Sequence, residues 1–569
     1  MKMRNIFKLA AIVLGASTLA TGCIQETFPQ NGNGTADQVG ESTFAADGLV
    51  ASVPAILVTN IIYNTHEDFG YPAIMVHLDH AIGEVFPSNA YTGGNQYYDR
   101  FQYYQYQLGL GPNGFCAMFW YHYYQFIKAA NDVISAVGNN ETTAQQRGTA
   151  KTFRAMYYLD MARMYDPLYA VSTERASYMA DLAKVEGLTV PIVDENTSEA
   201  DAANNPRTPR QDMFQFIFND LNDAETCLKG VTPTAKNLPS LAVVYGLKAR
   251  AYLWLGGFAD GLYDTTQYPD VLTGKAAYAK AAEYARLAIT ASGCQPLTEA
   301  EYCHPTTGFN TINNAWMWGM IQSNETIIAT LYTWGSHMCL TAGWGYGSGS
   351  QPGVRKATYE RMSNSDFRKK LIVGPGTTYA DYKDVTNLTE EEWTSFGLEK
   401  KGVRTYAHLK FRTNGGEKTD STKGNVVDIP LMRVEEMYFI EAEASEHVTP
   451  GTGKALLASF MTSYRDPKYV FPATLVGEKE IIDEIIFQKR CEFWGEGILF
   501  HDFKRLDMGI ENGYDGTNTP AGMDFQTEGR CPAWNFVIPI DEYQQNAALK
   551  DKNNPDPSQT LKPKTELEE

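Results

Sequence analysis

The chain has 569 residues, with 67 acidic and 48 basic side chains and a formal charge of −19. A negative field of this size disfavours polyanionic ligands, nucleic acid most of all, and leaves neutral glycans and mixed-charge peptides open. Aromatic residues are abundant, with 34 Tyr, 27 Phe and 9 Trp. No CxxC motif occurs, so a zinc knuckle or a redox dithiol is not indicated.

The first residues have the pattern of an export signal. Three basic side chains lie within the first eight positions, and Leu9 to Ala20 is almost wholly apolar. This run is shorter than the roughly 20 residues that a membrane-spanning helix needs. Small residues then precede Cys23, so we predict a lipoprotein signal peptide over residues 1–22, with lipid attached to Cys23 after cleavage. The alternative is an ordinary secretory signal followed by a chance cysteine.

The composition after the signal divides the chain in two. Residues 23–48 are rich in Gln, Asn, Gly and Thr, and we expect them to form a flexible tether. Residues 49–569 are expected to form one mainly α domain. The seven other cysteines cannot all pair, because their number is odd. Whether Cys294 and Cys303 form a disulfide is left open by their spacing.

Helical periodicity, interrupted by Pro, Ser and Gly, predicts the helices of the first half. They are expected at 115–137, 142–165, 210–228, 240–255 and 275–291. They come in pairs, with alanines where two helices would touch, as in Ala249-x-Ala251 and Ala281-Ala282-x-x-Ala285. Paired helices of this kind predict a tetratricopeptide-like solenoid, with repeats over about 110–291 and 430–500.

The periodicity is lost between residues 292 and 428, where Gly, Thr, Asn and Trp are frequent. We predict a loop-rich insertion here, with short strands at 326–333 and 404–411. Helices are expected again at 431–446, 454–464 and 478–494.

Several segments resemble, in the same order, motifs of the SusD/RagB family of outer-membrane nutrient-binding lipoproteins of Bacteroidetes. The matching stretches span roughly residues 110 to 546, and it is their ordered set that is specific. They are Arg154-Ala-Met-Tyr-Tyr-Leu with Met164-Tyr-Asp-Pro167, Asp220-Leu-Asn-Asp-Ala224, Lys248-Ala-Arg-Ala-Tyr-Leu253, Pro430-Leu-Met-Arg433 with Glu441-Ala-Glu-Ala444, Lys489-Arg-Cys-Glu-Phe-Trp-Gly-Glu-Gly497 with Asp502-Phe-Lys-Arg505, and Val537-Ile-Pro-Ile-Asp-Glu542.

The resemblance implies a binding protein that is not an enzyme and needs no cofactor. It would capture oligosaccharide at the outer face of the outer membrane and deliver it to a TonB-dependent, SusC-like transporter. The charged motif residues are expected to be structural, because buried charges of both signs need partners. We predict that they form a paired polar seam on adjoining helices; they are Arg433, Glu441, Glu443, Arg490, Glu492 and Glu496.

Two other patterns could carry chemistry. The glycine-rich stretch 343–353 lacks the GKS/T ending of a phosphate loop, and we interpret it as a flexible surface loop. His77, Asp79, His80 and Glu84 have the spacing of metal ligands, but too few ligands are present for a zinc site, and none is predicted. No pair of carboxylates is singled out as catalytic.

Aromatic residues in loops are the candidate ligand contacts, because their rings suit the apolar faces of sugars and equally suit peptide side chains. The resemblance implies contacts from an early loop and from the insertion. Within those regions we select Tyr97, Tyr98, Trp316 and Trp318, with Asn95 and Asp99 as polar partners. The alternative is that half or more of these aromatics pack the insertion onto the helices.

Three other functions remain open on the sequence. A peptide-binding, RagB-like uptake component would keep the fold and change the ligand. A helical surface glycosidase would turn its ligand over, and a repeat scaffold would bind only protein.

Overall fold

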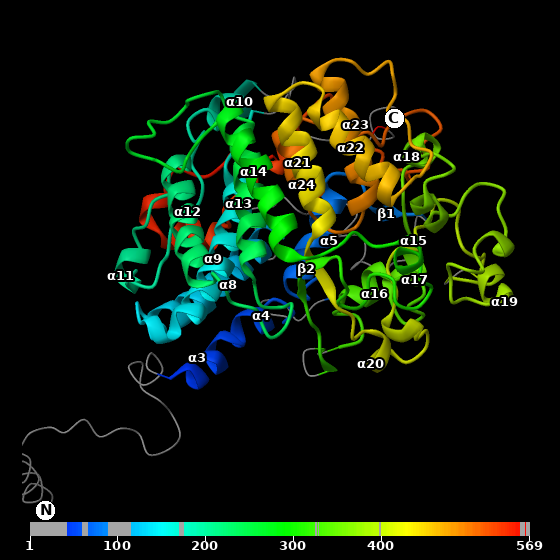
Figure 1. Ribbon diagram of the computed structural model, residues 1–569, viewed down its shortest axis with the longest axis horizontal. Helices are drawn as coiled ribbons and strands as arrows, with labels where there is room; N and C mark the ends of the chain where they lie inside the picture. Colours follow the sequence, from blue (N-terminus) through cyan, green and yellow to red (C-terminus); the bar gives the residue numbers. More distant parts are fainter. Residues whose placement is uncertain are drawn as a thin grey trace, which may run out of the picture.

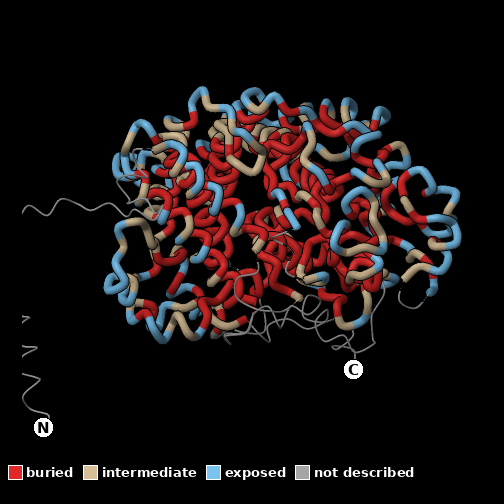
Figure 2. The backbone as a smooth tube through the Cα atoms, turned by 90° about the horizontal axis from the view of Figure 1, so that it is seen from below, coloured by how far each residue is buried: buried red, intermediate tan, exposed pale blue. Residues whose placement is uncertain are grey.

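The computed structural model describes residues 42–59, 66–88, 115–169, 176–324, 327, 329–397, 400–557 and 564. Paired helices fill one side of the molecule, and a loop-rich part with short helices fills the other (Figure 1). Buried backbone runs through both parts, and exposed backbone forms the rim (Figure 2). Within the described residues, no helix has the length and apolar character needed to cross a bilayer.

Within the described part of the chain, eight long helices form the body of the molecule. They are α8 (Phe115–Val137), α9 (Ala144–Tyr165), α12 (Arg210–Cys227), α13 (Leu241–Gly256), α14 (Gly274–Ser292), α21 (Val434–Val448), α22 (Thr452–Tyr464) and α23 (Glu478–Phe493). Consecutive helices from α8 to α14 pack side by side, and α14 packs on α21, which contacts α22 and α23. The predicted tetratricopeptide-like helical fold is confirmed, and the predicted helix ends lie within a few residues of those observed.

Small residues set the close contact between α13 and α14. Ala249, Ala251, Ala281 and Ala285 have no exposed surface, as their spacing predicted. Gly256 is also needed there, because a Cβ at this position would lie 2.5 Å from the ring of Tyr278.

Shorter elements cover the ends of the body. They are α3 (Thr43–Val50), α4 (Ser52–Ile56), α5 (Tyr71–Ala81), η1 (Glu141–Thr143), α10 (Ala176–Leu182), α11 (Glu199–Ala202), α24 (Leu499–Arg505), η6 (Pro532–Trp534), α25 (Ile540–Gln545) and η7 (Ala547–Leu549). Helix α3 begins inside the stretch predicted to be a tether, with Ser42 as its N-cap, and packs on α8 and α9. The folded part therefore starts earlier than the predicted boundary at residue 48.

The insertion consists of short elements joined by turns. They are α15 (Glu299–Tyr302), β2 (Trp316–Met320), α16 (Trp334–Met338), α17 (Tyr346–Ser350), β3 (Pro352–Gly353), α18 (Lys356–Arg361), η3 (Phe367–Leu371), η4 (Tyr379–Asp381), α19 (Glu390–Thr394), η5 (Asn414–Gly416) and α20 (Ser421–Gly424). Residues 329–333 are turns and bends, and 404–411 carries only isolated bridges at Ala407 and His408. Both predicted strands are therefore wrong in the part that the structure describes.

Two antiparallel strand pairs attach the insertion among the residues that the structure describes. Strand β2 pairs with β4 (Ile429–Arg433), with Trp316 opposite Arg433 and Met320 opposite Ile429. The sequence predicted a helix from residue 431, but the chain first completes this strand. Strand β1 (Phe86–Pro87) pairs with β3, which joins the segment after α5 to the middle of the insertion.

Of the six residues predicted to form one polar seam, Glu441, Glu443 and Arg490 pair elsewhere, with Arg286, Arg505 and Glu84. The seam is confirmed for Arg433, Glu492 and Glu496, and Glu492 is at its centre. This carboxylate is fully buried and pairs with Arg465 at 2.7 Å, Arg433 at 3.1 Å and Arg368 at 3.2 Å. Burial alone would raise the pKa of Glu492, but the three guanidinium groups outweigh it and hold the pKa well below its usual range. The carboxylate therefore stays charged inside the protein.

The seam also joins the insertion to the helices. Arg368 comes from the insertion, and so does Lys410, whose ammonium is fully buried and pairs with Glu496 at 2.6 Å. Glu496 also accepts from Arg433 at 2.8 and 2.9 Å. Residues distant in sequence thus share one hydrogen-bonded cluster.

Other motif charges pair between neighbouring helices. Arg154 of α9 makes a two-pronged contact with Asp220 of α12, at 2.7 and 2.8 Å. Arg250 of α13 does the same with Glu436 of α21, at 2.7 and 2.6 Å. Paired arginine–carboxylate forks fix direction as well as distance, so they set how adjacent helices lie against each other.

We predict that Glu492→Gln lowers the free energy of unfolding by about 3–5 kcal/mol, because it leaves three buried guanidinium groups without their shared negative charge. Urea denaturation of the two proteins measures the difference. Glu441→Gln is the matched control, since Glu441 pairs with Arg286 at 2.5 Å but that arginine is 48% exposed. A loss in Glu492→Gln no larger than in the control would contradict the central role of Glu492.

A histidine at the end of α21 gives the stability a pH dependence. His447 stacks on Tyr278 at 3.9 Å and pairs with Glu478 at 2.7 Å and Glu443 at 3.9 Å. Burial alone would lower the pKa of His447, but Glu443 and Glu478 outweigh it and raise the pKa above its usual value. Folding thus favours the protonated ring.

This ring therefore stabilises the fold fully below its unfolded pKa of about 6.5, and its contribution disappears as the pH rises through the raised pKa of the folded state. We expect the stability difference between the wild type and His447→Gln to be larger at pH 6 than at pH 9. Denaturation curves at both pH values measure it. A difference that is constant or grows with pH would refute the assignment.

Candidate functional site

The early loop chosen from the sequence lies outside the described residues. Tyr97, Tyr98, Asn95 and Asp99 all fall there, so their placement stays a prediction. The described residue before this segment, Ser88, donates its backbone N–H to the carbonyl of Gln351 at 3.1 Å, immediately after α17. The segment therefore leaves the described fold beside α17.

The two tryptophans chosen from the insertion have a different position from the one expected. Trp316 and Trp318 lie on β2 and have no exposed surface. The indole of Trp318 donates to the carbonyl of Asn237 at 3.1 Å and packs 4.8 Å from the ring of Phe153 on α9. In this structure neither ring has surface that a ligand could contact. Trp318 packs the insertion onto the helices, which was the alternative interpretation, and Trp316 is buried on the same strand.

A different group of rings meets at the edge of the insertion, which we call the aromatic cluster: His66, Tyr332 and Tyr346. The ring centre of His66 lies 5.2 Å from that of Tyr332 and 5.7 Å from that of Tyr346. His66 and Tyr332 are half-buried, and Tyr346 is 9% exposed. Beneath them, His337 lies 5.1 Å from Tyr346 and stacks on Phe69 at 4.7 Å. Segments almost 300 residues apart thus supply one surface.

The histidines of this region are neutral at neutral pH. Burial lowers the pKa of His66, and it lowers the pKa of His337 to about 3. Nε2 of His337 lies 2.9 Å from the carbonyl of His66 and 3.2 Å from that of Leu331. Because carbonyls only accept, this nitrogen carries the proton. His66 contacts the hydroxyl of Tyr346 through Nδ1. The cluster is therefore aromatic and polar without carrying charge.

One buried side chain holds the segment that carries Tyr332. Asn425 is fully buried, and its amide donates to the carbonyl of Thr330 at 2.9 Å. Its oxygen accepts from the hydroxyl of Thr333 at 2.8 Å and from the indole of Trp344 at 3.0 Å. Trp344 is half-buried and packs on Gly424, where a Cβ would meet its ring at 2.1 Å. The amide thus fixes residues 330–344 against α20.

A polar hollow lies next to this anchor. It has a volume of about 630 Å³ and is lined by Asn324, Lys423, Val426 and the turn 414–419. Val426 directly follows Asn425, so the hollow and the segment that carries Tyr332 share one support. Amide and hydroxyl groups here can exchange hydrogen bonds with a ligand's hydroxyls.

The other two sequence patterns have structural roles. The glycine-rich stretch forms α17 and β3, and Ser348 and Ser350 are buried, so the prediction of a surface loop is wrong. The stretch also contributes Tyr346 to the aromatic cluster. The sequence did not indicate this residue, because the surrounding glycines suggested mobility. Within the described residues, no three His, Cys, Asp or Glu side chains are grouped to hold a metal. Cys294 and Cys303 are both free thiols.

Asp79, His80 and Glu84, which have the spacing of metal ligands, are buried side chains with structural roles. Asp79 accepts from the backbone of Gly497 at 2.9 Å. Glu84 pairs with Arg490 at 2.8 Å and Arg355 at 2.9 Å. Burial lowers the pKa of His80 to about 4, so its imidazole is neutral.

Comparison with known proteins gives a consistent result. Residues 72–253 match a family described as "Starch-binding associating with outer membrane", and residues 304–565 match one described as "SusD family". No curated protein matches the chain.

Solved structures share the fold over most of its length. A SusD-like carbohydrate binding protein from Bacteroides vulgatus is 21% identical, with a TM-score of 0.65, covering 90% of this chain and 98% of its own. A SusD superfamily protein from Bacteroides thetaiotaomicron is 15% identical, with a TM-score of 0.63 and coverage of 90% and 99%. One from Bacteroides fragilis is 16% identical, with a TM-score of 0.58 and the same coverage.

The two family matches together cover the helical body except α14, and most of the insertion. They include the charged motif residues Arg433, Glu492 and Glu496, which the structure pairs in its polar seam. The chain therefore belongs to the SusD/RagB family.

Proposed function

We propose that this chain captures oligosaccharide at the outer membrane and delivers it to a TonB-dependent, SusC-like transporter. The family's description as starch-binding and associated with the outer membrane supports a role in carbohydrate uptake. The observation that carries the proposal is the aromatic cluster, in which the half-buried rings of His66 and Tyr332 lie at the edge of the insertion and Asn425 anchors the segment that carries Tyr332.

The chemistry of the cluster suits a neutral sugar. The C–H faces of a sugar ring are apolar and stack on Tyr or imidazole rings, and its hydroxyls need nearby polar groups. His66 is neutral, so no fixed charge has to be desolvated when such a ligand binds. The hollow beside Asn425 supplies amide groups for a second sugar unit.

The early loop belongs to the same proposal. Tyr97 and Tyr98, with Asn95 and Asp99, follow Ser88, which lies against the end of α17. Helix α17 begins with Tyr346. We therefore propose that this loop adds contacts to the ligand held by the aromatic cluster, and we no longer assign that role to Trp316 and Trp318.

The membrane attachment is part of the same proposal. Lipid on Cys23 would hold the chain on the outer membrane, and the polar residues that follow it would give the domain reach. Growth of cells carrying Cys23→Ala on the cognate glycan would test the need for the anchor.

Calorimetric titration of the domain lacking residues 1–23 with defined oligosaccharides and with peptide pools tests the ligand class. Binding to oligosaccharides alone supports the proposal. Binding to peptides alone would replace it with a RagB-like peptide-uptake role. Release of new reducing ends from the glycans, sustained over many turnovers, would instead identify a glycosidase.

We predict that Tyr332→Ala weakens oligosaccharide binding by about tenfold to a hundredfold, since truncating a central aromatic contact costs roughly 1.4–2.8 kcal/mol. The same titration measures the affinity. Tyr169→Ala is the matched control, because Tyr169 is 62% exposed and lies outside the insertion. Equal affinity of Tyr332→Ala and wild type would remove the aromatic cluster from the site.

A further inference from the structure

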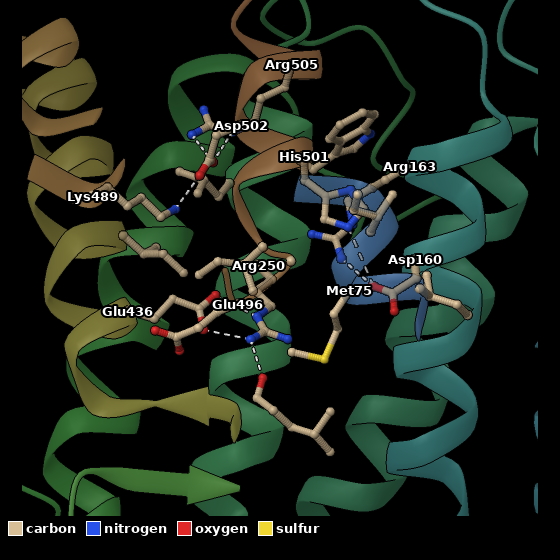
Figure 3. Close-up of a pocket in the computed structure, with 18 of the residues that line it drawn as sticks. Met75, Asp160, Arg163, Arg250, Glu436, Lys489, Glu496, His501, Asp502 and Arg505 are labelled. Carbon is tan, nitrogen blue, oxygen red and sulfur yellow. Dashed lines mark hydrogen bonds and ion pairs between the residues drawn. The ribbon is translucent and has the colours of Figure 1, made fainter. Parts of the chain in front are cut away.

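A second, smaller cavity lies inside the helical body, away from the aromatic cluster. It is enclosed by α5, α9, α13, α21, α23 and α24, and charged side chains from several of these helices point into it (Figure 3). Its volume is about 40 Å³. Since one water needs roughly 10–15 Å³ of such space, the cavity holds a few waters or one monatomic ion.

The carboxylates that line the cavity already have partners. Asp160 accepts from Arg163 at 2.5 Å and from the hydroxyls of Tyr71 and Tyr123 at 2.7 and 3.1 Å. Both oxygens of Glu436 accept from Arg250. Asp502 pairs with Lys489 and Arg505, and Glu496 pairs with Lys410 and Arg433. Each of the four is buried, and each carries at least one cationic partner.

The donors, by contrast, are not all used. Arg163 donates through Nε to Leu159 and through Nη2 to Asp160, and its Nη1 donates to no described residue. Arg250 uses Nε and Nη2, again leaving Nη1. His501 is 8% exposed, its Nδ1 is buried without a hydrogen-bond partner among the described residues, and its Nε2 lies 4.0 Å from Asp160. Two guanidinium nitrogens and one imidazole nitrogen that line the cavity are therefore available to an occupant.

Cationic side chains also act on the imidazole of His501. Burial lowers the pKa of this imidazole well below its usual value, and Arg163, Arg250, Lys504 and Lys489 lower it further. The ring is therefore neutral, and the charges that influence its pKa most are positive. A buried space lined by unused N–H groups of two guanidinium cations favours an occupant that accepts hydrogen bonds and carries negative charge.

We propose that this cavity binds one small monovalent inorganic anion of the halide class, held by the guanidinium groups of Arg163 and Arg250 and by the imidazole of His501. These side chains belong to α9, α13 and α24. A bound anion would therefore link three helices of the body. Its role is independent of the oligosaccharide site.

Anomalous scattering from crystals of the wild-type protein grown with sodium bromide tests the site directly and needs no variant. We expect a bromide peak within hydrogen-bond distance of Arg163, Arg250 and His501. Density in the cavity that refines as water, with no anomalous signal, would overturn the proposal.

Thermal unfolding at constant ionic strength tests whether the ion is part of the folded state. An anion that binds only the folded protein stabilises it in proportion to ln(1 + [L]/Kd). We expect the wild-type Tm to rise as sodium gluconate is replaced by sodium chloride, because gluconate is too large for a 40 Å³ cavity. A bromide peak without any such rise would mark an adventitious ion only, and would also overturn the proposal.

A conservative variant separates the cavity from general salt effects. Arg163→Lys keeps the positive charge but replaces the guanidinium, and with it Nη1, by a single ammonium group. We expect this variant to lose at least half of the chloride-dependent rise in Tm. Arg286→Lys is the matched control, since Arg286 forms an exposed pair with Glu441 and should respond as wild type does. If Arg163→Lys does not fold, the bromide experiment decides alone.

Discussion

The burial of one carboxylate between three guanidinium groups constrains much of the molecule. Glu492 on α23 meets Arg368, Arg433 and Arg465, and these come from the insertion, the end of β4 and the end of α22. An ion left unpaired in this interior would cost several kcal/mol, so the four segments are stable only when they meet. The insertion is therefore part of the fold and not an appendage on it.

The same constraint explains why the aromatic cluster is presented on a firm surface. The insertion is attached to the helices through β2, through Arg368 and through Lys410. Within it, Asn425 fixes the segment that leads to Tyr332. Rings held in place before a ligand arrives lose less entropy on binding, which is how a small contact surface can still bind usefully.

The helical body was predictable from the sequence, and the interior of the insertion was not. Helices such as α8 carry their own signals, an apolar periodicity and a glycine at the end, and these act over a few neighbouring residues. The elements of the insertion are two to six residues long and exist because of distant partners, as β2 does because of β4. The charged motif residues were predicted to pair, but their individual partners depend on the packing of the helices.

The ligand contacts show the same limit. Trp316 and Trp318 lie in a stretch whose two faces are both covered, so a tryptophan in a Gly- and Thr-rich region gave no information about exposure. The sequence did not single out Tyr346, because it lies among glycines. In the structure these residues form the short buried helix α17. His66 enters the cluster only because the segments before and after α5 contact the insertion, which no local pattern records.

The antiparallel pairing of β2 with β4 has a consequence for how such a receptor can diversify. The chain leaves the helical body after α14 and returns at α21, and these two helices pack directly on each other. The residues between these two helices form one insertion, which is closed at its base by the pairing of β2 with β4. Provided that the two strand pairs and the buried cations Arg355, Arg368 and Lys410 are kept, the other turns of the insertion can change in length and sequence. New ligand preferences can then arise by substitutions within the insertion, without any repacking of the helical body.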